Sequence, residues 1–125
     1  MTITPLRIAG AVLFFLFIIL SGFWLSRSSR PFNSGILTIH KLISIGTVLF
    51  LGIIIYQINK SSSLSAIDII AVVVTGVFFL ITIITGGLVS ALKTTPTAIL
   101  RLHQTTPWLT TLSTAVTLIL LRAGK

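Results

Sequence analysis

Four long apolar runs, separated by short polar links, make up most of the chain. The runs cover about residues 6–25, 36–58, 66–92 and 97–121. Each is long enough to cross roughly 30 Å of hydrocarbon as an α-helix that rises about 1.5 Å per residue. Because the links are short, consecutive helices are expected to run antiparallel as neighbours. The pattern predicts an all-α fold, an integral membrane up-down-up-down four-helix bundle that forms a single transmembrane domain over residues 1–125.

The links carry residues that are typical of helix ends. Pro5 stands where the first helix begins, a position at which a missing backbone N–H costs nothing. Ser65 and Asp68 have the spacing of a capping box for the third helix. The first run resembles a secretory signal because Arg7 stands near its start, but no small-x-small cleavage pattern follows at residues 21–24. We therefore expect the first run to be retained as a transmembrane helix.

The composition is typical of a membrane protein, so the lipid bilayer is an expected partner. Hydrophobic residues make up 54% of the chain, which is too many for a water-soluble domain. The formal charge is +8, but the basic residues stand singly or in pairs between the apolar runs. This spacing is typical of helix-end anchors for lipid headgroups, so no nucleic-acid partner is expected. Cysteine is absent, which excludes disulfides, iron–sulfur clusters and covalent haem attachment.

The chain contains two histidines, His40 and His103, near the starts of the second and fourth predicted helices. Both helices begin on the membrane side that holds the links at residues 26–35 and 93–96, which we call the histidine side. The histidines lie roughly 6 and 9 Å below these starts. In an up-down bundle the two helices are diagonal partners about 11–14 Å apart, a gap that two imidazoles and a metal can fill. The pair predicts bis-histidine ligation of one haem b.

Small polar residues continue the helix faces of both histidines. Ser44 and Thr47 follow His40, and Thr106 and Thr110 follow His103 at the head of a longer stripe. We predict that these four residues bind the cofactor, since a flat macrocycle needs small neighbours. Membrane helices also use small residues for close packing, and that alternative stays open for the stripe. Packing is the role we predict for five glycines of the first and third helices, namely Gly10, Gly22, Gly76, Gly86 and Gly87.

Two further residues near His103 are candidates for supporting the site. Arg101 is the preferred partner of the haem propionates because a guanidinium binds a carboxylate bidentately. The alternative is that Arg101 binds lipid phosphate. Pro107 removes the backbone hydrogen bond that the His103 carbonyl would accept, which predicts a kink that aims the imidazole inward. The alternative for Pro107 is that it ends a first helical turn.

Other chemistry fits the sequence less well. Two imidazoles without a nearby carboxylate or thiol fall short of the four ligands that zinc prefers. Ion-coupled transporters place a carboxylate within the membrane, whereas Asp68, the one acid, stands at a helix end. No acid is near either histidine to orient it as a base for a serine nucleophile. The sequence therefore predicts an electron-transfer protein rather than a hydrolase or transferase.

Short segments around the histidines resemble small bacterial four-helix membrane proteins distantly like the cytochrome b561 group. The segments are Leu37–Leu42, Thr85–Leu88 and Leu100–His103 with Pro107. The resemblance covers about residues 34–121 and implies non-covalent bis-histidine haem b at His40 and His103. It also implies a multi-pass protein of the bacterial inner membrane that exchanges electrons with a quinone or a redox protein. That group typically holds two haems through four histidines, so this chain would be a single-haem variant acting at one membrane face.

A second interpretation remains open from the sequence. The chain could be a non-catalytic structural or accessory subunit of a larger membrane complex, whose histidines bind a pigment singly or bind nothing. The two interpretations differ in an observable property, since only a b-type cytochrome has the absorption bands of low-spin haem.

Overall fold

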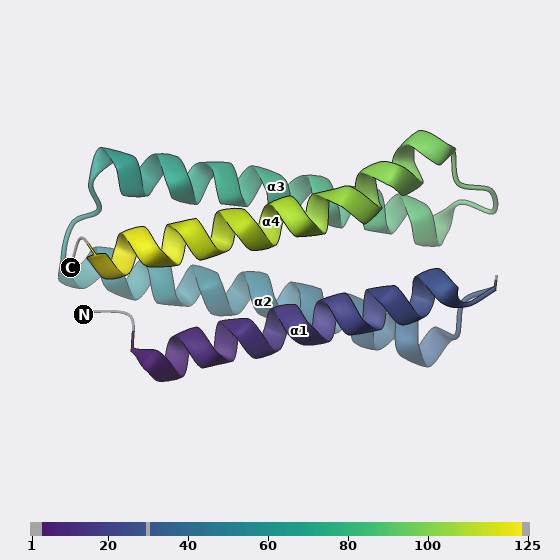
Figure 1. Ribbon diagram of the computed structural model, residues 1–125, viewed down its shortest axis with the longest axis horizontal. Coiled ribbons are helices and arrows are strands. Elements are labelled where there is room, and N and C mark those ends of the chain that lie inside the picture. The colour runs from purple at the N-terminus through teal and green to yellow at the C-terminus, as the bar shows by residue number, and fades with distance from the viewer. Residues whose placement is uncertain (1–3, 30, 124–125) are drawn as a thin grey trace. The chain divides into compact units, whose positions relative to one another are not determined.

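The computed structural model describes residues 4–29 and 31–123, and these residues form four α-helices (Figure 1). The helices are α1 (Pro5–Arg27), α2 (Ser34–Ser61), α3 (Ala66–Ala91) and α4 (Thr97–Ala123). No strand occurs in the described residues, so the all-α prediction is confirmed. Each helix begins and ends within three residues of the apolar run that predicted it.

The helices pair as two antiparallel hairpins (Figure 1). One hairpin packs α1 against α2 and the other packs α3 against α4. The links inside the hairpins are residues 28–33 and 92–96. These links are too short to let the chain return along any other path, which is why each helix folds back on the one before it.

The two hairpins fill their interiors with different side chains. In the first hairpin the rings of Phe14 and Phe50 lie 5.2 Å apart, and Gly10 leaves room for the Phe50 ring. Aromatic pairs at this separation add to the apolar contact between the helices. The first hairpin is therefore held in its middle by aromatic packing.

The second hairpin is held instead by hydroxyl groups. Thr75 Oγ1 lies 2.6 Å from Ser113 Oγ and 2.9 Å from Thr117 Oγ1. A second link joins Thr82 Oγ1 to Thr110 Oγ1 at 3.1 Å. Hydroxyls that bond across helices satisfy one another where no water is available. These bonds show that Thr110, Ser113 and Thr117 of the small-residue stripe join α4 to α3.

Three of the helices, α1, α2 and α3, are long and apolar enough to span a membrane. Large apolar side chains cover their exposed faces, as lipid contact requires. We predicted four spans, but α4 does not reach the same apolar content because it carries the hydroxyl stripe. The hydroxyls of α4 donate to carbonyl oxygens of their own helix, for example Thr106 to Leu102 and Thr114 to Thr110.

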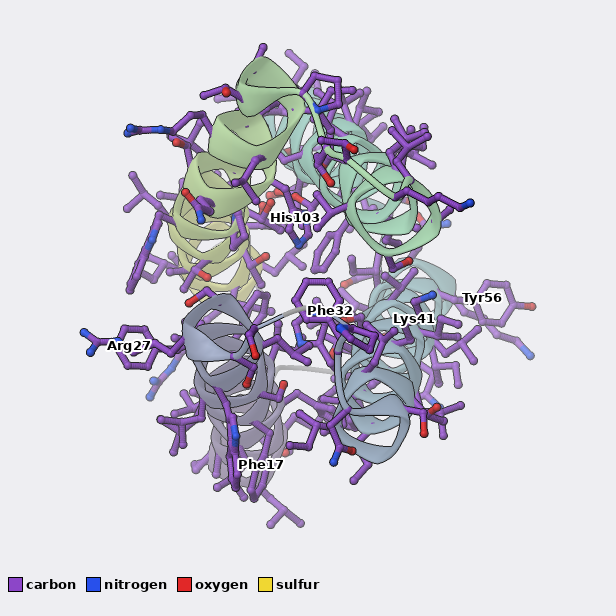
Figure 2. The ribbon with its side chains drawn as sticks, turned by 90° about the vertical axis from the view of Figure 1, so that its right-hand side faces the viewer. Phe17, Arg27, Phe32, Lys41, Tyr56 and His103 are labelled. Atoms are coloured by element: carbon purple, nitrogen blue, oxygen red, sulfur yellow. The ribbon has the colours of Figure 1, made fainter. Side chains whose placement is uncertain are left out.

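The side chain of Tyr56 is exposed and points outward from α2 (Figure 2).

The predicted capping box at the start of α3 is confirmed. Asp68 N–H donates to Ser65 Oγ at 3.2 Å, and the Ser65 N–H donates to Asp68 Oδ2 at 2.9 Å. Two backbone donors at the helix start are satisfied in this way. The single acid of the chain is therefore used to begin a helix.

Removing the capping hydroxyl should destabilise the second hairpin. We expect Ser65→Ala to lower the free energy of unfolding by about 1 kcal/mol, because the Asp68 N–H loses its acceptor. Unfolding of the detergent-solubilised protein, followed by circular dichroism, measures this change. Ser29→Ala, at an exposed link position, is the control. Equal stability of the two variants would contradict the role of the cap.

Candidate functional site

Each histidine occupies the same position in its own hairpin. His40 is the seventh residue of α2 and His103 is the seventh residue of α4. Both side chains are half-buried and contact the preceding helix of their hairpin. Figure 2 shows the His103 side chain between the ribbons of α3 and α4. Both histidines therefore lie near the turn of a helical hairpin and are held by both of its helices.

A serine on α1 bonds to the His40 ring. Ser21 Oγ lies 2.8 Å from His40 Nδ1 and also 2.7 Å from the Phe17 carbonyl oxygen and 3.1 Å from that of Ile18. A carbonyl oxygen can only accept, so these two contacts use the Ser21 hydroxyl proton. When that proton is directed to the backbone, the Ser21 oxygen accepts from His40 Nδ1–H. A neutral His40 then carries its lone pair on Nε2.

A threonine on α3 does the same for His103. Thr85 Oγ1 donates to the Ile81 carbonyl oxygen at 2.7 Å and lies 3.1 Å from His103 Nδ1. The Thr82 carbonyl oxygen lies 3.1 Å from the same ring nitrogen and can only accept. His103 Nδ1 is therefore the donor to both neighbours. The lone pair of neutral His103 is again on Nε2.

Glycine stands next to each of these hydroxyl residues and allows the imidazole to approach the helix backbone. A Cβ atom at Gly22 would lie 3.1 Å from His40 Cε1. A Cβ atom at Gly86 would lie 2.8 Å from His103 Cε1, a distance that real Cβ atoms essentially never show. Each imidazole thus rests in a space that exists because the facing residue has no side chain. The hydroxyl–glycine pairs Ser21–Gly22 and Thr85–Gly86 are the central elements of the two sites.

The glycine predictions have a mixed outcome. Gly10 packs against Phe50, as expected. Gly22 and Gly86 do more than pack helices, because they contact the rings of the candidate ligands. At Gly76 and Gly87 an added Cβ would meet nothing within 4 Å, so neither glycine packs against the facing helix of its own hairpin.

The four small residues predicted to bind the cofactor direct their hydroxyls to their own helices. Ser44 donates to the His40 carbonyl and Thr47 to the Ile43 carbonyl, both at 2.7 Å. Thr106 and Thr110 donate to the carbonyls four residues earlier, at 2.9 and 2.8 Å. Thr47, Thr106 and Thr110 are buried. These hydroxyls are satisfied by the backbone, and their contact with a cofactor stays a prediction.

Arg101 does not join His103 within the hairpin. It is exposed and stands two residues before the histidine on α4, and residues two apart do not face each other on a helix. Pro107 lies inside α4, which continues through it to Ala123, so Pro107 does not end the helix. Of the residues predicted to form the site, the two histidines are the ones whose contacts with the neighbouring helix are described in most detail.

Sequence reasoning missed Ser21 and Thr85, whose hydroxyls lie within hydrogen-bond distance of the histidine rings. The sequence does contain a signal for them. The dipeptide Ser21–Gly22 begins 19 residues before His40, and the dipeptide Thr85–Gly86 begins 18 residues before His103. Comparison of the two halves of the chain would have found it. No family model, curated protein or solved structure matches this chain. Among the described residues, no three His, Cys, Asp or Glu side chains are grouped so that they could hold a metal ion.

Proposed function

We propose that the protein is a membrane b-type cytochrome that binds one haem b non-covalently. His40 and His103 are its axial ligands, and it transfers electrons at one face of the membrane. The observation that carries the proposal is that Nδ1 of each ring lies within hydrogen-bond distance of a hydroxyl on the neighbouring helix. With Nδ1 donating to that hydroxyl, Nε2 is the nitrogen with a lone pair in both residues, which is the form that ligates iron.

The donor set suits haem better than a bare metal ion. Two neutral imidazoles would hold a haem iron, for which the porphyrin supplies the remaining ligands. Without a grouped third side chain, the same two histidines would leave zinc incompletely ligated. The absence of cysteine from the whole sequence requires that the group is held without thioether bonds.

The chain's own residues have distinct parts in this function. When bound, the haem supplies a one-electron redox centre, and two axial imidazoles favour electron transfer over oxygen chemistry. Ser21 and Thr85 hold the Nδ1 protons and orient the rings. Gly22 and Gly86 give the rings access to the helix backbone.

Topology favours action at a single face. We propose that α4 is the fourth span, since its threonine hydroxyls donate to helix carbonyls and so present fewer free donors to lipid. The two hairpin turns then lie on one membrane side, and each histidine is near its turn. A quinone or a redox protein on that side is the expected electron partner. The bacterial inner membrane is the location that we propose, and Arg101 remains the candidate partner of the propionates.

An absorption spectrum tests the proposal directly. The purified protein, as isolated or after haem addition, should show the α-band of dithionite-reduced low-spin haem, with one haem per chain. The pyridine haemochrome assay gives the stoichiometry. A protein that shows no such band, even with added haem, is not a cytochrome. That result would favour the accessory subunit of a larger membrane complex, whose histidines bind a pigment singly or bind nothing.

A further inference from the structure

The second helices of the two hairpins begin with related sequences. Ser34–His40 reads Ser-Gly-Ile-Leu-Thr-Ile-His, and Thr97–His103 reads Thr-Ala-Ile-Leu-Arg-Leu-His. The isoleucine, leucine and histidine are identical, and three other positions exchange similar residues. The two segments are 63 positions apart in the chain. The hairpins are therefore related as a sequence repeat that includes the histidine.

The first helices repeat as well, at a distance of 64 positions. Phe14–Phe15 corresponds to Phe78–Phe79, and Ser21–Gly22 corresponds to Thr85–Gly86. The distance changes from 64 to 63 because the link at residues 28–33 is one residue longer than the link at residues 92–96. The repeat thus pairs the hydroxyl–glycine elements with each other, just as it pairs the histidines.

Burial follows the same correspondence. Every buried residue described in α1 and α2 has a buried counterpart in α3 or α4. The pairs are Ala11 and Thr75, Leu25 and Val89, Thr47 and Thr110, Leu51 and Thr114, Ile54 and Thr117, and Ile58 and Leu121. The two hairpins therefore use the same helix faces in the same register.

The repeat preserves the histidine site while the middle of each hairpin changes. Phe50 of the first hairpin corresponds to Ser113 of the second, and Ala11 corresponds to Thr75. Aromatic packing in one hairpin is thus replaced by a hydroxyl cluster in the other. The two sites nevertheless keep the hydroxyl, the glycine and the Nδ1 bond. Packing alone does not require this, because the hairpins pack well with different interiors.

We propose that Ser21 and Thr85 are positioning residues that fix His40 and His103 in one and the same tautomer. A neutral imidazole in this tautomer carries its lone pair on Nε2, the nitrogen that would ligate the metal of the proposed tetrapyrrole. The identity of that ligand rests on the proposed function, whereas the tautomer does not. Hydroxyl groups that hold the second nitrogen of a ligating imidazole orient the ring and raise its basicity.

The apo-protein allows the tautomers to be measured without any cofactor. Labelling with ¹⁵N-histidine gives signals from only two rings, which single His→Ala variants assign. In the unsubstituted protein both rings should be Nδ1–H. Ser21→Ala should move the His40 tautomer ratio toward Nε2–H by about fivefold, the effect of one hydrogen bond. Thr85→Val should move His103 by less, because the Thr82 carbonyl still accepts from Nδ1.

Conservative and matched variants separate positioning from a general structural role. Ser21→Thr and Thr85→Ser keep the hydroxyl and should restore the original tautomers. Ser26→Ala and Ser90→Ala should leave both rings unchanged. These two serines correspond in the repeat and donate to carbonyls of their own helices, one on α1 and one on α3. In haem titrations, loss of either positioning hydroxyl should weaken binding by about 10- to 100-fold.

The possible results distinguish the two proposals. Unchanged tautomers in Ser21→Ala and Thr85→Val overturn the positioning role, even if the protein binds haem. A weaker haem affinity that Ser21→Thr and Thr85→Ser do not restore also counts against it. Tautomer changes as expected, in a protein that takes up no haem, uphold the positioning role and overturn the cytochrome.

Discussion

His40→Ala and His103→Ala are each expected to abolish the six-coordinate low-spin haem spectrum while the helices still insert into the membrane. If both imidazoles ligate one iron, removing either leaves at most one axial protein ligand, and the low-spin state is lost completely. The two substitutions should therefore have equal effects. Absorption spectra of the oxidised and reduced variants, compared at equal protein concentration, measure the loss.

The size of the loss also separates one shared haem from two independent sites. If each hairpin bound its own ligand, each single variant would keep about half of the signal. Lys41→Ala and Gln104→Ala are the controls, because these exposed residues stand directly after the histidines and share their depth. Both controls should keep the full spectrum. A complete low-spin spectrum in either histidine variant would remove that histidine from the ligand set.

The helices were predictable because their pattern is local. Apolar runs of membrane-spanning length and the polar links between them are visible residue by residue, and the bounds of all four helices followed from them. The capping box of Ser65 and Asp68 is likewise a local signal with a fixed spacing. Features of this kind depend on neighbours within one or two helical turns, so the sequence alone contains the necessary information.

The surroundings of the histidines depend on which helix faces meet, and no local pattern specifies that. Ser21 bonds to a residue 19 positions later, and Thr85 to one 18 positions later, through the register of a helix pair. The histidines could be singled out because an ionisable residue in lipid is costly. A serine or a glycine in a membrane helix is common, so its role appears only when the facing ring is known.

The hydroxyl stripe of α4 illustrates how one pattern supports two interpretations. Its residues are small, which suits both a flat cofactor and a close helix contact. The bonds from Thr75 to Ser113 and Thr117 favour the helix contact in the middle of α4. Closer to the turn, His103 bonds to a hydroxyl of the preceding helix, α3, rather than to one of α4. His40 bonds in the same way to a hydroxyl of α1. The His103 ring is therefore held by α3, and the middle of the stripe joins α4 to α3.

Gly86→Ala should disrupt the His103 site, whereas Gly87→Ala should not. A methyl group at Gly86 would lie 2.8 Å from His103 Cε1, so the ring must move away from Thr85 and from the Thr82 carbonyl. Overpacking of this kind costs about 1–3 kcal/mol. We expect Gly86→Ala to be less stable than Gly87→Ala by that amount and to lose most of the low-spin haem signal.

Gly87→Ala is the matched control because it changes the same residue type in the same helix, where nothing lies within 4 Å. Both variants gain the same helix propensity of about 1 kcal/mol, so their difference isolates the contact with the ring. Gly22→Ala should fall between them, since its methyl group would lie 3.1 Å from His40 Cε1 and a small ring movement relieves the contact. Unfolding in detergent and haem spectra of the three variants give the order. If Gly86→Ala behaved like Gly87→Ala in both measurements, the close approach of His103 to α3 could not be what positions the ring.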